Sequence, residues 1–232
     1  MYRRVVDFAS SVVFNYSYLP FSQARLLPIW VNRLHFSKYA KYCGKIVIES
    51  DTIYPRMIRL GVDFNYWYPE EGIKLFVHGT IIFKGKCLIG NNSTIYVKNG
   101  GTLIIGDGVS LSANNSILCE NSITIDNNTK IAWGCQIMDT DFHYMHNVKS
   151  GECTLTKSKP IYIGQNNWIG KNCEIFKGFI TCDYVTVGGG SKCLGQIVEP
   201  YTVWSSGGKM EKLKDGWCID RTKDPDLFSK LL

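Results

Sequence analysis

Residues 163–175 read IGQNNWIGKNCEI, and this stretch decides the fold. Ile163, Ile169 and Ile175 recur every six residues in it. The same spacing extends in both directions: it includes Ile105, Leu111, Ile117 and Ile123, then after a slip of two residues Ile125, Ile131 and Ile137, and after Ile175 it continues through Thr181, Val187 and Cys193. A fixed short repeat is typical of a β-solenoid, in which one strand and turn cannot bury their own apolar face and must stack on the next.

Two further positions of the repeat support this prediction. Gly often follows the aliphatic residue, as in Ile163-Gly164 and Ile169-Gly170, where we expect it to take a turn conformation that a Cβ would hinder. A small or short residue often stands four positions after it, for example Cys135, Cys173 and Ser191. A sandwich would instead alternate with period two.

The repeat is lost between residues 138 and 162, and Asp139-Thr140-Asp141-Phe142-His143 stands at the start of this interruption. Read as an extended segment, it places Asp139, Asp141 and His143 on one face. A carboxylate bonded to one imidazole nitrogen leaves the other nitrogen able to take a substrate proton. The pattern indicates His143 as general base, oriented by Asp141 or, as second choice, Asp139. A polar loop whose acids cap turns is the other interpretation.

Composition narrows the class of protein. The chain has 232 residues, a net charge of +6 and 45% hydrophobic residues, which is a soluble globular profile that favours anionic ligands. Its charges are spread along the chain, so nucleic-acid binding has little support. Nine Cys without a C-x-x-C pair indicate reduced core thiols in a cytoplasmic protein, and neither a membrane-spanning run nor a secretory signal is expected.

The N-terminal region predicts a helix over residues 3–18, ending before Pro20. Val5, Phe8 and Val13 belong to its apolar stripe, which we expect to pack on the body of the protein, while a polar stripe of Asp7, Ser11 and Asn15 lies opposite. Peripheral contact with the inner face of a membrane is the alternative for the apolar stripe. A second element, residues 24–34, is expected to be a kinked helix or an irregular bridge.

These motifs resemble the hexapeptide-repeat acyltransferases, whose fold is a left-handed parallel β-helix. The resemblance rests on residues 159–164 (KPIYIG), 168–173 (WIGKNC), 187–191 (VGGGS) and 199–203 (EPYTV). With the N-terminal helix and the D-x-D-x-H segment, the chain is most similar to the O-acetyltransferases of capsule and exopolysaccharide pathways. Thr181 and Cys193 depart from the aliphatic pattern.

The resemblance implies an all-β chain with an N-terminal helical segment at 1–45, a β-helix at 46–210 that carries the 138–162 loop, and a C-terminal tail with a short helix at 211–232. It also implies a homotrimer with active sites between subunits, acetyl-CoA as donor, a sugar, nucleotide sugar or oligosaccharide as acceptor, and no metal. The residues expected to bind coenzyme A are Trp168, Gly188, Gly189, Gly190, Ser205, Lys209 and Lys212. His146 is expected to contact the acceptor.

Three alternatives remain at this point. An amine of an amino sugar could replace the hydroxyl as acceptor. A catalytically silent β-helix could scaffold polysaccharide assembly. A zinc hydrolase on the same fold needs three imidazoles for each metal ion, and the chain has four His of which only His143 and His146 are near one another in sequence.

Overall fold

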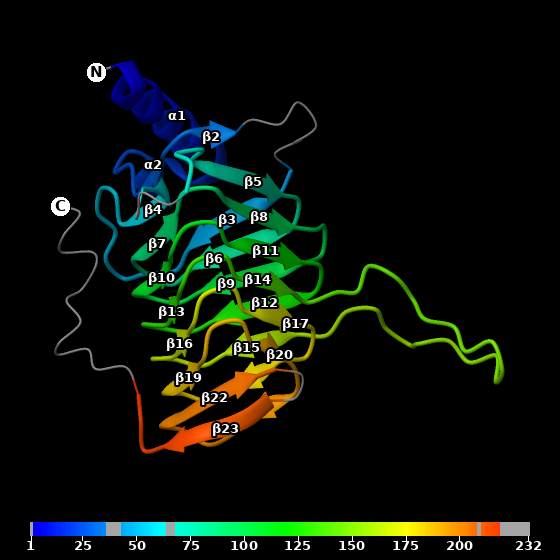
Figure 1. The fold of residues 1–232 in the computed structure, drawn as a ribbon. Helices are drawn as coiled ribbons and strands as arrows, with labels where there is room; N and C mark the ends of the chain where they lie inside the picture. The colour runs from blue at the N-terminus through cyan, green and yellow to red at the C-terminus, as the bar shows by residue number, and fades with distance from the viewer. Residues whose placement is uncertain (1, 36–42, 64–67, 208–209, 219–232) are drawn as a thin grey trace.

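The computed structural model describes residues 2–35, 43–63, 68–207 and 210–218. Within these ranges the strands form three sheets, and from β1 to β22 consecutive strands belong to different sheets in strict rotation. Three sheets wound in this way form a three-sided prism along which the chain advances coil by coil (Figure 1). The predicted parallel β-helix is confirmed.

The three sheets have the following strands. Sheet A contains β1 (Ile29–Val31), β4 (Ile58–Val62), β7 (Cys87–Gly90), β10 (Val109–Leu111), β13 (Lys130–Ile131), β16 (Trp168–Ile169), β19 (Val185–Val187), β22 (Thr202–Ser206) and β23 (Met210–Asp215). Sheet B contains β2 (Leu34–His35), β5 (Ile73–Val77), β8 (Ser93–Val97), β11 (Ser116–Cys119), β14 (Gln136–Met138), β17 (Glu174–Phe176) and β20 (Lys192–Cys193). Sheet C contains β3 (Lys45–Ile48), β6 (Thr80–Phe83), β9 (Thr102–Ile105), β12 (Ser122–Ile125), β15 (Ile161–Ile163), β18 (Ile180–Thr181) and β21 (Gln196–Ile197).

The aliphatic residues of the six-residue repeat form the core of the prism. Leu111, Ile131 and Ile169 are register partners on neighbouring strands of sheet A, and each is buried. The two departures from the pattern are buried as well. Cys193 fills its position as a small apolar residue, and the hydroxyl oxygen of Thr181 accepts hydrogen bonds inside the prism. Stacked burial at every repeat position explains why the six-residue spacing persists.

The glycines that follow the aliphatic residues have a different structural role from the predicted one. Gly164 and Gly170 do not have positive φ angles, so the expectation that they occupy turns is wrong. A Cβ on Gly170 would lie 2.5 Å from the backbone nitrogen of Gly189 in the next coil. The left-handed conformation occurs two residues later, at Asn166 (φ 56°) and Asn172 (φ 55°). Glycine is therefore required by the close approach of coils, and asparagine supplies the turn.

The prism begins earlier than the predicted boundary at residue 46. Strand β1 pairs in parallel with β4, with Ile29 opposite Ile58, so the first coil starts at Ile29. The helical interpretation of residues 24–34 is also wrong, because this range contains strand β1 and only its first residue belongs to a helix, the short α2 (Phe21–Ala24). Helix α1 (Tyr2–Tyr18) packs against β1 at this end of the prism, where no coil precedes among the described residues.

Helix α1 confirms the predicted N-terminal helix, but the stripe that faces the prism is the polar one. The amide of Asn15 donates to the carbonyl of Ile29 (2.6 Å) and accepts from its N–H (3.1 Å). The hydroxyl of Ser11 accepts from the N–H of Val31 (2.9 Å), and both polar side chains are fully buried. They satisfy the backbone of the edge strand β1, which would otherwise present unpaired groups.

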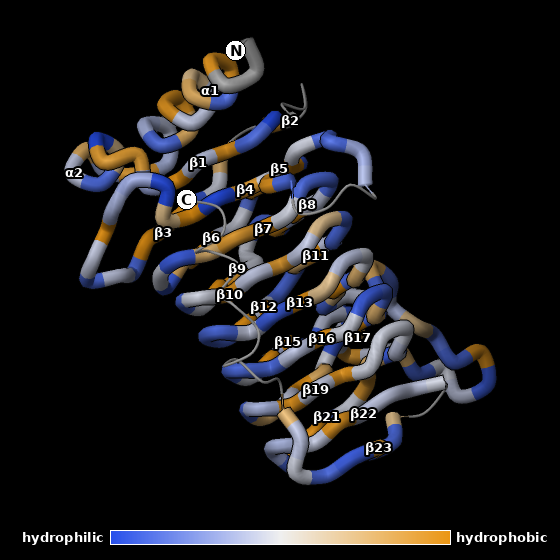
Figure 2. Tube along the Cα trace, turned by 60° about the vertical axis from the view of Figure 1, so that its left-hand side comes forward, coloured by the Kyte–Doolittle hydropathy of each residue, from blue (hydrophilic) through white to orange (hydrophobic). Residues whose placement is uncertain are grey.

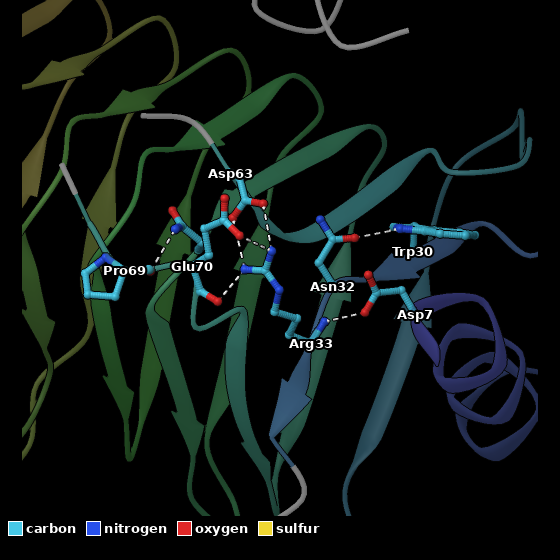
Figure 3. Close-up of polar contacts among 8 residues, drawn as sticks. Asp7, Trp30, Asn32, Arg33, Asp63, Pro69 and Glu70 are labelled. Carbon is cyan, nitrogen blue, oxygen red and sulfur yellow. Dashed lines mark hydrogen bonds and ion pairs between the residues drawn. The ribbon is translucent and has the colours of Figure 1, made fainter. Parts of the chain in front are cut away.

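A third polar side chain of α1, that of Asp7, also bonds to a backbone group of the chain beside β1. The carboxylate of Asp7 accepts a hydrogen bond from the N–H of Arg33 (2.8 Å; Figure 3). Val5, Phe8 and Val13, expected to pack on the body, are exposed instead, at 61%, 49% and 58%. The expected packing of this apolar stripe is thus wrong, because hydrogen bonds to the sheet edge fix the opposite face of the helix inward. Neither of the described helices is both long and apolar enough to cross a membrane.

The interruption of the repeat forms a loop at residues 139–160, which leaves the prism after β14 of sheet B and returns at β15 of sheet C. Antiparallel bridges between Thr140 and Ser158 and between His146 and Cys153 join its two arms, which extend far from the prism (Figure 1). At the C-terminal end, residues 210–215 form β23, antiparallel to β22, where a tail was expected. The predicted C-terminal helix lies outside the described residues.

Candidate active site

A groove of about 750 Å³ follows the outer face of sheet A from β10 to β22. It is lined by Ser110, Ser112, Lys130, Ile131, Ala132, Trp133, Trp168, Gly170, Lys171, Thr186, Val187, Gly188, Gly189 and Val203. This volume lies within the range of small-molecule and cofactor sites. The predicted residues Trp168, Gly188 and Gly189 are therefore brought together on one face.

Strand alternation explains the position of Trp168. Ile169 is directed into the prism, so its neighbour on β16 is directed outward, and the indole is 43% exposed. Its register partners are Lys130 on β13 and Thr186 on β19, both of which also line the groove. The indole thus stands between a cation and a hydroxyl on adjacent coils.

The glycine run after β19 contributes backbone to the groove rather than side chains. The N–H of Gly188 donates to the carbonyl of Trp204 (2.7 Å), and the N–H of Gly190 donates to that of Lys171 (2.7 Å). Within the described chain, Gly189 alone of the three has no such backbone bond. Gly190 does not line the groove, and Ser205 lies behind Gly188, 3.4 Å from the Ser191 hydroxyl.

Two cations of the groove are not among the residues predicted from the sequence. Lys130 and Lys171 line it, and the ammonium of Lys171 lies 6.0 Å from the centre of the Trp133 ring. The available signal was their place just before Ile131 and just after Gly170 in the repeat. Of the lysines that were expected, Lys209 lies outside the described residues. Lys212 instead forms an ion pair with Glu199, whose hydrogen bond raises the pKa of the ammonium.

His143 lies near the start of the loop, and its side chain is exposed. No hydrogen bond to its imidazole occurs among the described residues. Asp141 is also exposed, and its carboxylate forms an ion pair with Lys177. The predicted extended segment is not formed, because Phe142 adopts a left-handed conformation with φ 60°. The alternation that would place all three residues on one face is therefore broken.

Asp139 is separated from the other two residues of the motif by its burial. It is fully buried, and its two oxygens accept the backbone N–H groups of Glu120 and Asn121, each at 2.8 Å. It caps the turn between β11 and β12 at the root of the loop. Asp139 and the exposed His143 are thus not brought together.

Glu120 connects the turn between β11 and β12 to both arms of the loop. Its carboxylate forms ion pairs with Lys157 (2.9 Å) and Lys98 (3.3 Å), and it accepts the hydroxyl of Thr140 at 3.1 Å. Burial raises the pKa of Glu120, but the hydrogen bonds from Lys157 and Lys98 outweigh it and hold the pKa below its usual value. The root of the loop is therefore fixed by charge on the body of the prism.

His146 forms a polar contact inside the loop. Its Nδ1 lies 3.3 Å from the Sγ of Cys153 on the opposite arm, at one of the two antiparallel bridges. Both side chains are exposed. This contact holds the two arms together near the middle of the loop.

The loop and the groove do not meet within one chain. The loop leaves at the junction of sheets B and C, whereas the groove lies on sheet A, and none of its lining residues comes from 139–160. Figure 1 shows the loop extending from the prism on the side away from β13, β16 and β19. One copy of the chain therefore presents the two halves of the predicted site on different faces.

Comparison with known proteins gave the following relatives. No protein-family model matches the chain. It is similar to the polysialic acid O-acetyltransferase of Neisseria meningitidis, with 24% identity over 155 residues that span 49% of this chain and 71% of that protein. The solved structure of the polysialic-acid-specific acetyltransferase NeuO aligns with a TM-score of 0.53 and 16% identity, over 82% of this chain and 94% of NeuO. That of the polysialic acid O-acetyltransferase OatWY aligns with a TM-score of 0.43 and 21% identity, over 84% and 94%.

The rotation of strands among three parallel sheets, the six-residue core and the likeness to NeuO define the class. The chain has a parallel β-helix fold, which it shares with NeuO and which the resemblance seen in its sequence predicted. Within this class it is similar to a polysialic acid O-acetyltransferase in sequence and to NeuO in structure.

Proposed function

We propose that this protein transfers the acetyl group of acetyl-CoA to a hydroxyl of a sugar in a surface polysaccharide. The observation that carries the proposal is the groove on sheet A, where Trp168, two lysines and side-chain-free backbone at Gly188 and Gly189 line one continuous space. The similarity to polysialic acid O-acetyltransferase supports the reaction and the kind of acceptor. A cytoplasmic location follows from the use of acetyl-CoA.

The donor fits the groove by its chemistry. The pantetheine arm is narrow and partly apolar, so it suits the surface beside Trp168 where Gly188 and Gly189 have no side chains. Lys130 and Lys171 are placed to meet the anionic phosphates of coenzyme A. We expect Lys130 and Lys171 to bind these phosphates in place of Lys212, which forms an ion pair with Glu199.

The exposed loop supplies the catalytic base in this proposal. The imidazole of His143 takes the proton of the acceptor hydroxyl while the hydroxyl oxygen attacks the thioester carbon. The bond between this carbon and sulfur then breaks, and coenzyme A leaves as a thiolate. Asp141 orients the ring once substrates are bound, exchanging its ion pair with Lys177 for His143. Asp139 is assigned to the loop root because both its oxygens are used there. His146 contacts the acceptor.

The site requires two copies of the chain. Because the loop and the groove occupy different faces, a loop from one copy must lie against the groove of another, and a closed ring of three copies satisfies every loop and groove. We therefore propose a homotrimer with three equivalent sites.

The acceptor is proposed to be an acidic glycan. The net charge of +6 and the exposed Lys149 and Lys159 of the loop favour an anionic polymer. An amino-sugar acceptor uses the same residues and differs only in the attacking atom. A silent scaffold, in contrast, predicts neither turnover nor binding of acetyl-CoA.

Release of free coenzyme A from acetyl-CoA tests the proposal against a panel of neutral and acidic polysaccharides, polysialic acid included. Replacing His143 by Ala is expected to lower turnover by ~10²–10⁴-fold, the usual contribution of a general base. His78→Ala, which alters a histidine beside Tyr96 on the prism, is the matched control and should leave turnover unchanged. Equal activity of the His143→Ala variant and the parent would refute the assignment of the base.

A further inference from the structure

The outward face of helix α1 is largely exposed in the described chain. We call this the α1 apolar face: it consists of Val5, Phe8, Val13 and Tyr16, with Phe21 of α2 beside them, and all five side chains are about half exposed or more. The rings of Tyr16 and Phe21 lie 6.3 Å apart, so the face continues from one helix to the other. Helices α1 and α2, which carry this face, lie at the N-terminal end of the prism (Figure 2).

The orientation of α1 is fixed by the sheet and not by this face. The buried side chains of Ser11 and Asn15 hydrogen bond to β1, so the helix cannot rotate to bury its apolar stripe without breaking them. Breaking them would leave edge-strand backbone groups unpaired. The apolar stripe is thus held outward by the fold.

The segment that carries the face is basic in its sequence. Residues 1–25 include Arg3, Arg4 and Arg25, and their one acidic residue is Asp7, whose carboxylate accepts the N–H of Arg33. Arg56 extends the basic rim, because its guanidinium lies 4.0 Å from the ring centre of Trp30. Trp30 in turn contacts the face, with its ring 6.3 Å from that of Phe8.

An apolar helix face with an aromatic and arginine rim suits an interfacial helix that lies on anionic lipid. A second copy suits it less, because pairing two such faces would bring like charges together. We propose that the α1 apolar face docks on the surface of an anionic phospholipid bilayer. Docking at this end leaves the groove of sheet A and the 139–160 loop accessible, and the proposal does not depend on the reaction assigned to them.

Flotation of the full-length protein with vesicles tests this proposal. The protein should float with vesicles of phosphatidylcholine and phosphatidylglycerol but not with phosphatidylcholine alone, and salt should weaken the binding. Val5→Asp with Val13→Asp should reduce binding by at least ~30-fold, because two apolar contacts are lost and two anionic charges are added. Val198→Asp, an equally exposed valine on the opposite end of the prism, should bind as the parent does. Unchanged thermal unfolding of each variant excludes loss of fold as the cause.

Two results would overturn the proposal. The first is absence of binding to anionic vesicles, or equal binding by the parent and the Val5→Asp, Val13→Asp variant. The second is a smaller assembly for that variant in sedimentation, which would make the face a contact between copies.

Discussion

Asp139 shows how one residue of a motif can have a different task from its neighbours. In D-x-D-x-H it stands two residues from Asp141, yet it is buried and caps the turn at Glu120 and Asn121, whereas Asp141 is at the surface. The interpretation as a turn-capping acid, one of two that the motif allowed, describes the contacts of Asp139. The local sequence does not separate the two tasks, because burial depends on which coil lies beneath.

Asp139→Asn is expected to lower the free energy of unfolding by about 1–3 kcal/mol, since the amide group of Asn offers only one acceptor oxygen to two buried N–H donors. Urea denaturation measures the change. Asp141→Asn is the matched control, and removal of its surface ion pair should cost well under 1 kcal/mol. Equal losses for the two variants would contradict the assigned difference in burial.

At the scale of elements, the 139–160 loop depends on the body of the prism at its root. Glu120 binds Lys157 on the returning arm and Thr140 on the departing arm. Helix α1 depends on the prism in a comparable way, because Ser11 and Asn15 fix it to β1. Both elements are positioned by polar contacts with strands distant in sequence.

The pH dependence of stability tests the Glu120 contacts. Because the folded pKa of Glu120 lies below its ordinary value of 4.5, its contribution is present at neutral pH and is lost as the pH falls through the lowered folded pKa. Glu120→Gln should therefore destabilise the protein by about 1 kcal/mol at pH 7, and by less at each step below pH 4.5. Urea midpoints at pH 7, 5, 4 and 3 measure this difference. A difference independent of pH would indicate that lost packing, not lost charge, is responsible.

At the scale of the whole molecule, the proposed site forms only between copies, which a complementation experiment can test. His143→Ala removes the loop base, and Ala132→Trp fills the groove beside Trp133. Each variant alone is expected to be inactive. In trimers reassembled from an equal mixture, about one site in four combines an intact loop with an intact groove, and turnover should recover to about that fraction. If each site lay within one chain, the mixture would stay inactive.

Several features of this protein could be predicted from its sequence because they depend on local repetition. The core positions and the interruption follow from the six-residue spacing, since every coil must place an apolar residue inward to stack on the next. The N-terminal helix follows from the helical spacing of its apolar residues. The residues of the groove were predicted in part: Trp168, Gly188 and Gly189 belong to recognisable repeat motifs, whereas Lys130 and Lys171 do not stand out among other surface lysines.

The sequence by itself determined the β-helix, because a period of six residues allows few other ways to bury its aliphatic side chains. The tertiary structure alone decided which stripe of α1 faces inward, that Asp139 is buried, and that Gly170 is needed for the contact between coils. Each of these depends on backbone groups brought close by folding, namely β1, the turn after β11 and the coil at Gly189. A hydrogen-bond donor or a steric limit that a distant segment supplies cannot be predicted from the spacing of nearby residues in the sequence.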